Sequence, residues 1–98
     1  MAYAYTAVTA ESEVAALTGD LIRFDTTNAS DDGGPGTERP AAEYVAEKLA
    51  EVGYEVTYVE SGARGRGNVI ARLTGSDQQR GALLVHGHLD VVPADAAE

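Results

Sequence analysis

Cysteine is absent from the 98-residue sequence, and this absence excludes several kinds of protein. Without cysteine there is no disulfide scaffold, no zinc site built on thiolates and no cysteine nucleophile. The same absence is compatible with the cytoplasm, where we expect the protein to be found. The sequence also lacks an apolar run of membrane-spanning length, and residues 1–8 lack the basic region and apolar core of a signal peptide. We therefore expect no membrane association.

Basic residues are scarce in this sequence. Seven lysines and arginines stand against sixteen aspartates and glutamates, which gives a formal net charge of −9. Nucleic acids and anionic membranes bind basic surfaces, so we expect neither as a partner. The hydrophobic share of 44% is typical of a globular protein, and 98 residues are enough for one small domain with a modest core.

Two segments have apolar residues at helical spacing. The first begins at Thr9, whose hydroxyl can cap a helix that we expect to run to about Phe24. The second follows Thr37 as its cap and ends where Gly53 suits a left-handed C-cap. Residues 25–36 between them are polar and rich in glycine, which predicts a surface loop.

Three strands are predicted after the helices. Residues 54–59 alternate apolar and polar side chains, which is typical of a half-buried strand near a sheet edge. Residues 68–73 form the second strand; Arg64 and Arg66 before it could bind an anion, but a solvated hairpin tip is the better interpretation. Residues 81–85 form the third and most apolar strand. The predicted fold class is therefore α/β, a partial three-layer-type domain with two helices packed on about three strands of a larger mixed sheet.

The residues that carry chemistry follow the third strand directly. His86, His88 and Asp90 occupy alternate positions, and alternate side chains of an extended chain share one face. Imidazole is a common metal ligand, and a nearby carboxylate can be a second ligand or can orient the imidazole. In α/β sheets, ligands bind beyond the carboxyl ends of strands, which is where His88 and Asp90 lie. The pattern indicates a metal site; a polar strand exit capped by Pro93 is the alternative without a metal.

The segment His88-Leu-Asp90-Val-Val-Pro93, preceded by Leu-Leu-Val-His-Gly, resembles the first metal motif of the co-catalytic zinc metallopeptidase and aminoacylase family. That family includes carboxypeptidase G, aminoacylase, acetylornithine deacetylase and succinyl-diaminopimelate desuccinylase. The resemblance extends upstream in the same order along the chain. It covers the family's first helix exit at residues 21–28, its second helix at residues 36–53 and the strand before the motif at residues 67–73.

The resemblance implies a hydrolase that cleaves amide bonds at a centre of two zinc ions, in which cobalt can substitute. It implies that His88 is the first zinc ligand and that Asp90 is the catalytic-site residue that orients His88 through a hydrogen bond. His86 has no constant role in the family, so we interpret it as a neighbour of the site. A small peptide or an N-acyl amino acid is the expected substrate, and a homodimer is one assembly that the protein could form.

The resemblance also implies residues that this sequence does not contain. A metal-bridging aspartate, a pair of glutamates with the general base, and further ligands would all follow downstream. Zinc sites use three or four protein ligands, so we expect His88 alone to bind zinc weakly. We therefore interpret residues 1–98 as the incomplete N-terminal part of the catalytic domain, and we expect no turnover from this chain alone.

Two other interpretations stay open. The spacing of His86, His88 and Asp90 is close to the signature of metallo-β-lactamase-like metal hydrolases, but that signature has a histidine where this sequence has Val91. Two helices ahead of the motif also fit the early strands of that fold poorly. The third hypothesis is a non-catalytic acidic domain whose exposed apolar edge binds a partner or drives self-association.

Overall fold

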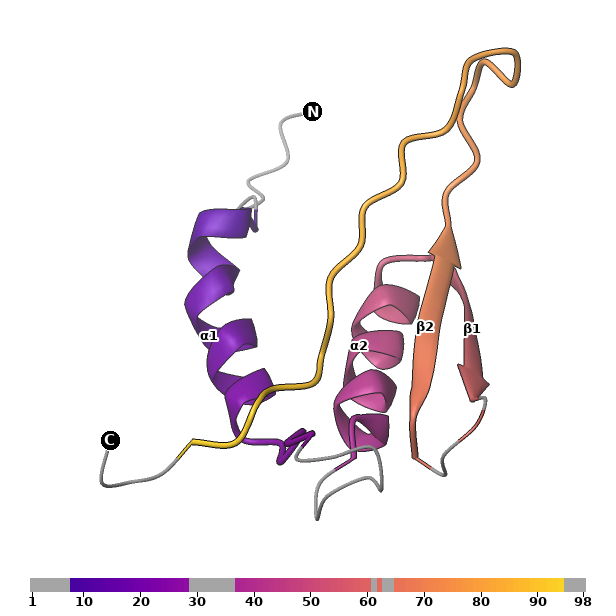
Figure 1. Ribbon diagram of the computed structural model, residues 1–98. Coiled ribbons are helices and arrows are strands. Elements are labelled where there is room, and N and C mark those ends of the chain that lie inside the picture. The colour runs from indigo at the N-terminus through magenta and orange to yellow at the C-terminus, as the bar shows by residue number, and fades with distance from the viewer. Residues whose placement is uncertain (1–7, 29–36, 61, 63–64, 95–98) are drawn as a thin grey trace.

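The computed structural model describes residues 8–28, 37–60, 62 and 65–94 (Figure 1). It contains helix α1 (Ala10–Ile22), helix α2 (Arg39–Glu51), strand β1 (Glu55–Glu60) and strand β2 (Gly67–Arg72). The described chain is a small mixed α/β unit, as predicted, with a sheet of two strands. Of the predicted loop, residues 29–36 lie outside the described residues. Neither helix in the described part is long and apolar enough to cross a membrane.

Helix α1 begins at the predicted cap. The Thr9 hydroxyl accepts a hydrogen bond from the Ser12 amide at 3.1 Å, and Ser12 Oγ accepts one from the Thr9 amide at 3.1 Å. This reciprocal pair is a capping box, which satisfies two of the amides that a helix start leaves unpaired. The helix ends at Ile22, shortly before the predicted Phe24, and none of its residues is buried.

Helix α1 is joined to α2 through one tyrosine. Tyr44 Oη donates to Asp20 Oδ2 at 2.7 Å, and the Tyr44 ring centroid lies 5.7 Å from that of Phe24. The hydrogen bond to Asp20, together with partial burial and the charge of that carboxylate, raises the pKa of Tyr44 to about 12. Helix α1 therefore rests on α2 through a few polar and ring contacts, because it has no buried apolar face.

The N-terminal cap of helix α2 differs from the prediction. Glu38, not Thr37, occupies the N-cap position, and its side chain makes no capping hydrogen bond. The Glu38 carboxylate instead pairs with Arg66, whose Nη1 lies 2.5 Å from Glu38 Oε2. Pro40 is accommodated in the first turn, where no amide donor is needed. At the other end, Gly53 has a φ of 96°, as the predicted left-handed C-cap requires.

Strands β1 and β2 form an antiparallel hairpin that packs on α2 (Figure 1). The register pairs Glu55 with Arg72 at one end and Glu60 with Gly67 at the other. Side chains of the hairpin largely alternate between half-buried and exposed, as predicted. The fully buried apolar residues of the described chain are two alanines of α2, so the core is small.

The prediction of a third strand is wrong in this structure. Residues 81–85 pair with no strand among the described residues, and Leu83, Leu84 and Val85 are 88%, 82% and 83% exposed. After β2 the chain turns and returns towards α1 as the orange-to-yellow trace of Figure 1. Consecutive apolar residues are typical of a strand covered on both faces. Among the described residues, no strand lies beside residues 81–85. This apolar segment is therefore not part of a sheet.

Candidate metal site

A single parallel bridge brings the motif to the exit of helix α1. The Asn28 amide donates to the Val91 carbonyl at 2.7 Å, and the Val91 amide donates to the Thr26 carbonyl at 3.0 Å. Thr26 is buried, with 4% of its surface exposed. The bridge fixes residues 89–91 against residues 26–28, where the yellow trace of Figure 1 turns towards the end of α1.

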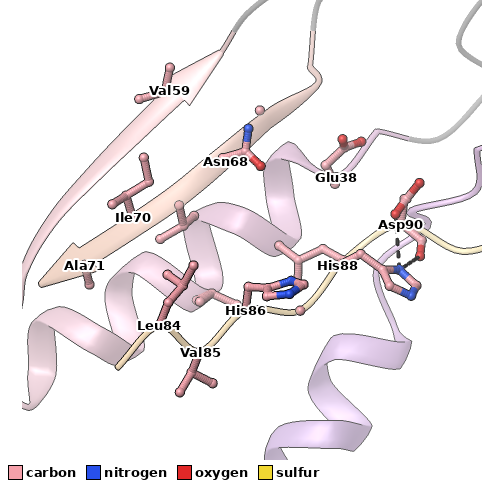
Figure 2. A pocket seen from close by; sticks show the side chains of 15 residues that line it. Glu38, Val59, Asn68, Ile70, Ala71, Leu84, Val85, His86, His88 and Asp90 are labelled. Carbon is pink, nitrogen blue, oxygen red and sulfur yellow. Dashed lines mark hydrogen bonds and ion pairs between the residues drawn. The ribbon is translucent and has the colours of Figure 1, made fainter. Parts of the chain in front are cut away.

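The imidazole of His88 faces Asp90. His88 Nδ1 lies 2.7 Å from the backbone oxygen of Asp90 and 3.2 Å from its Oδ1, as the dashed lines in Figure 2 mark. A backbone oxygen can only accept a hydrogen bond, so this contact places a proton on Nδ1; in the neutral ring, Nε2 then has the lone pair that a metal binds. The His88 side chain is 83% exposed. The structure therefore brings together the two residues predicted as ligand and orienting aspartate.

Asp90 is held from its other side by Asn28. Asn28 Nδ2 donates to Asp90 Oδ2 at 2.9 Å. This hydrogen bond is the main cause that lowers the pKa of the Asp90 carboxyl, and the nearby imidazole lowers it further. Sequence reasoning did not place Asn28 in the site, because the two residues are 62 positions apart and no spacing rule links them. The only signal was an amide side chain at the exit of the first helix.

His86 is a neighbour of this pair and does not join it. All three predicted side chains line one groove, but Figure 2 shows the His86 ring apart from the contact between His88 and Asp90. Within the described residues, no group of three or more histidine, aspartate or glutamate side chains is arranged to hold a metal ion. Residues 86–90 form no strand, so the shared face of an ideal strand is not kept.

The groove has a volume of about 560 Å³ and lies between β2 and residues 84–90. This volume is in the range of small-molecule sites. Figure 2 shows apolar side chains gathered at one end, among them Ile70, Ala71 and Leu84, with Glu38 and Asp90 at the other end. The pair of His88 and Asp90 therefore lies at the polar end of a partly apolar groove.

The donor set fits one position of a zinc site. His88 offers an exposed Nε2 whose partner nitrogen is already held. Asp90 has one carboxylate oxygen near His88 and the other bound to Asn28, so it is placed to orient a ligand. Glu38 in the same groove is paired with Arg66. Among the described residues, His88 and Asp90 thus have the geometry expected of one metal ligand and the carboxylate that orients it.

Arg66 is the residue that the sequence placed wrongly. It was expected at a solvated hairpin tip, but its side chain is 15% exposed and pairs with the equally buried side chain of Glu38. Arg66 Nη2 also reaches the Thr27 carbonyl at 3.5 Å. The expectation failed because the turn before β2 folds back on the start of α2. Arg64 lies outside the described residues.

No protein-family model, curated protein or solved structure matches this chain. The relation to the zinc metallopeptidase and aminoacylase family therefore stays a prediction from the motif.

Proposed function

We propose that this chain contributes a zinc ligand to a two-zinc hydrolase that cleaves an amide bond in a peptide or an N-acyl amino acid. Such a protein would belong with the metallopeptidases, carboxypeptidases, aminoacylases and deacetylases. The single observation that supports the proposal is the contact of His88 Nδ1 with Asp90, which leaves Nε2 exposed. Ligating histidines almost always donate their second ring N–H to a carboxylate, a backbone carbonyl or water, which fixes the tautomer and raises the basicity of the ligand.

Each residue of the site has a separate role in the proposal. His88 binds the metal through Nε2, and Asp90 keeps the proton on Nδ1 and the ring in place. Asn28 holds the Asp90 carboxylate in the ionised form that this task requires. Bound zinc supplies a Lewis acid for the amide carbonyl and lowers the pKa of a water. The apolar end of the groove suits a substrate side chain.

The remaining ligands and the general base are proposed to come from residues beyond those described. A catalytic zinc needs three protein ligands, and the described chain offers one. The exposure of Leu83, Leu84 and Val85 supports further strands beside them, because consecutive apolar residues of this kind are normally covered on both faces. We also propose a cytoplasmic location, which the absence of cysteine favours.

A zinc titration of the 98-residue chain, followed by NMR at the histidine rings, tests the ligand assignment. We expect weak binding that shifts the His88 resonances, because one imidazole cannot hold zinc tightly. His88→Ala should abolish the response, and His86→Ala should keep it as the matched control. Tight stoichiometric uptake, or an equal loss in both variants, would contradict the assignment.

Activity is tested on the longest natural protein that contains this sequence, loaded with zinc or cobalt. We expect cleavage of an N-acyl amino acid or a dipeptide that His88→Ala abolishes. Asp90→Asn should lower the metal affinity or the activity by about 10- to 100-fold, the usual effect of removing an orienting partner. Equal activity in His88→Ala and the wild type would sink the proposed function.

The exposed apolar segment favours a second candidate, a non-catalytic acidic domain that associates with a partner or with itself. Leu83, Leu84 and Val85 lie on a segment whose backbone has no strand beside it among the described residues. Sedimentation should then detect a homodimer or larger species of the 98-residue chain. A clean monomer with cooperative unfolding would count against this candidate. The metallo-β-lactamase-like alternative gains no support, because His86 stands apart from the pair.

A further inference from the structure

We propose that Arg66 and Glu38 are a positioning pair for the metal ligand: they hold residues 26–28, which in turn hold Asp90 and His88. This inference rests on the proposed function. It is argued from the contacts among the described residues. In this inference, Arg66 and Glu38 act on His88 indirectly. Their action is transmitted through Thr27 and Asn28.

The pair differs from the other lysine and arginine ion pairs of the described residues in burial. The side chains of Arg66 and Glu38 are both 15% exposed, whereas those of the other pairs are between 27% and 79% exposed. An exposed ion pair contributes little and tolerates movement. Taking two charges out of water is costly, so a pair like this one is kept in place only when its geometry is well defined.

The Glu38 side chain binds Arg66 and does not cap its own helix. It occupies the N-cap position of α2, where an oxygen acceptor normally binds a backbone amide of the first turn. No such hydrogen bond is made, and the carboxylate contacts Arg66 Nη1 at 2.5 Å instead. The Glu38 carboxylate therefore binds Arg66 and leaves the first amides of α2 without a side-chain cap.

The arginine reaches two elements at once. While Nη1 binds Glu38, Nη2 approaches the Thr27 carbonyl at 3.5 Å. Thr27 lies in the bridge to Val91, and the next residue, Asn28, binds the Asp90 carboxylate. A planar guanidinium can donate to two acceptors in a fixed geometry, and the compact ammonium of lysine cannot replace it in that role.

The junction is also closely packed where the arginine enters it. Gly65, directly before Arg66, lies so near to Thr37 that a Cβ atom there would be 2.7 Å from Thr37 Cγ2. The start of α2, the start of β2 and the exit of α1 therefore meet around one side chain. Loosening Arg66 should let residues 26–28 move, and with them the carboxylate that orients His88.

The test compares Arg66→Lys and Glu38→Gln with the wild-type 98-residue chain, using Arg39→Lys as a control. Arg39 is the first residue of α2 and forms more exposed ion pairs, with Glu43 and Glu60. Two quantities are measured: hydrogen exchange of the Asn28 and Val91 amides, and the zinc concentration that half-shifts the His88 ring resonances. Exchange within the β1–β2 ladder reports whether the hairpin stays folded.

We expect Arg66→Lys and Glu38→Gln to speed exchange at Asn28 and Val91 by about tenfold and to weaken the zinc response by about tenfold. The β1–β2 amides and the Arg39→Lys control should be unchanged. Wild-type behaviour of Arg66→Lys at both readouts would overturn the inference, since charge alone would then suffice. Faster exchange with an unchanged zinc response would overturn the link to His88. A wild-type chain whose His88 ignores zinc would refute the proposed function, while the exchange data would still decide whether the pair holds residues 26–28.

Discussion

The tautomer of His88 is set by a neighbour only two positions away. The backbone oxygen and the carboxylate of Asp90 both face Nδ1, so the chemistry open to Nε2 follows from local chain geometry. That closeness is why the sequence alone could predict the pair. Asn28 and Arg66 act on the same site from 62 and 24 positions away from Asp90, since residue 66 precedes residue 90 by 24. Contacts over such separations depend on the path of the whole chain, which side-chain spacing does not encode.

Tyr44 makes stability depend on pH in the alkaline range. Its hydrogen bond to Asp20 raises its pKa to about 12, above the ordinary 10.0 expected of the unfolded chain. A group with a higher pKa in the folded state contributes its full stability below the unfolded pKa and loses it as the pH rises through the folded one. We therefore expect the Tyr44 contribution to be complete below pH 10.0 and to be lost between pH 10.0 and about 12.

Urea unfolding of the wild type and Tyr44→Phe across this pH window checks the prediction. The wild type should lose stability more steeply, because the variant has no phenol at this position to ionise. Asp20→Asn keeps an acceptor but removes the charge, so the Tyr44 phenol should ionise at lower pH in that variant. Parallel stability profiles for the wild type and Tyr44→Phe would show that the hydrogen bond to Asp20 does not contribute in solution.

The elements that the sequence predicted well are those governed by short-range rules. The Thr9 cap, the Gly53 C-cap and the alternation along β1 each depend on residues within a few positions. The predicted cap at Thr37 was wrong by one residue, since Glu38 is the N-cap, and the partner of its carboxylate, Arg66, lies 28 positions further on. The strand predicted over residues 81–85 failed because a strand exists only beside another, and the described chain supplies none.

The turn between β1 and β2 offers a matched pair of glycines. Gly62 and Gly65 both have a φ of 79°, but a Cβ atom at Gly62 would meet no described residue within 4 Å, whereas at Gly65 it would lie 2.7 Å from Thr37. A non-glycine residue in this conformation costs about 1–3 kcal/mol at either site. Only Gly65→Ala adds a clash with a β-branched side chain, which has little freedom to turn away.

We expect Gly65→Ala to reduce the free energy of unfolding more than Gly62→Ala, by at least about 1 kcal/mol, the smaller end of the usual overpacking cost. Chemical denaturation of the two variants measures the difference directly, because the backbone strain is common to both. Equal losses would mean that the turn before β2 does not approach Thr37 closely in solution.

Packing is uneven among the described residues. Helix α2 and the hairpin pack together, while α1 has no buried residue and the segment before the motif is almost fully exposed. A net charge of −9 opposes the self-association that exposed apolar side chains promote. The site therefore lies between the packed part, α2 with the hairpin, and the part with few contacts, α1 with the exposed segment before the motif.

This difference in packing predicts a small effect on stability for one substitution and a large effect for another. Leu84 is 82% exposed, so Leu84→Ser should change the free energy of unfolding by no more than about 0.5 kcal/mol, as is usual for surface positions. It should also reduce any self-association measured by sedimentation. Ala42 is 0% exposed, and Ala42→Leu should destabilise the chain by about 1–3 kcal/mol through overpacking. A loss at Leu84 as large as that at Ala42 would show that the segment is packed in solution.

The hydrogen bond between Asn28 and Asp90 bears on the order in which the chain can assemble. The hairpin closes between Glu60 and Gly67, seven positions apart, whereas the site closes between residues 62 positions apart. The entropy of closing a loop rises with the logarithm of its length, at roughly 0.6 kcal/mol for each doubling, so about three doublings separate the two events. The hairpin can therefore form early, and His88 takes its position late. Whatever binds at His88 therefore acts on one of the longest-range closures of the described chain, the one that also includes the hydrogen bond between the Val91 amide and the Thr26 carbonyl.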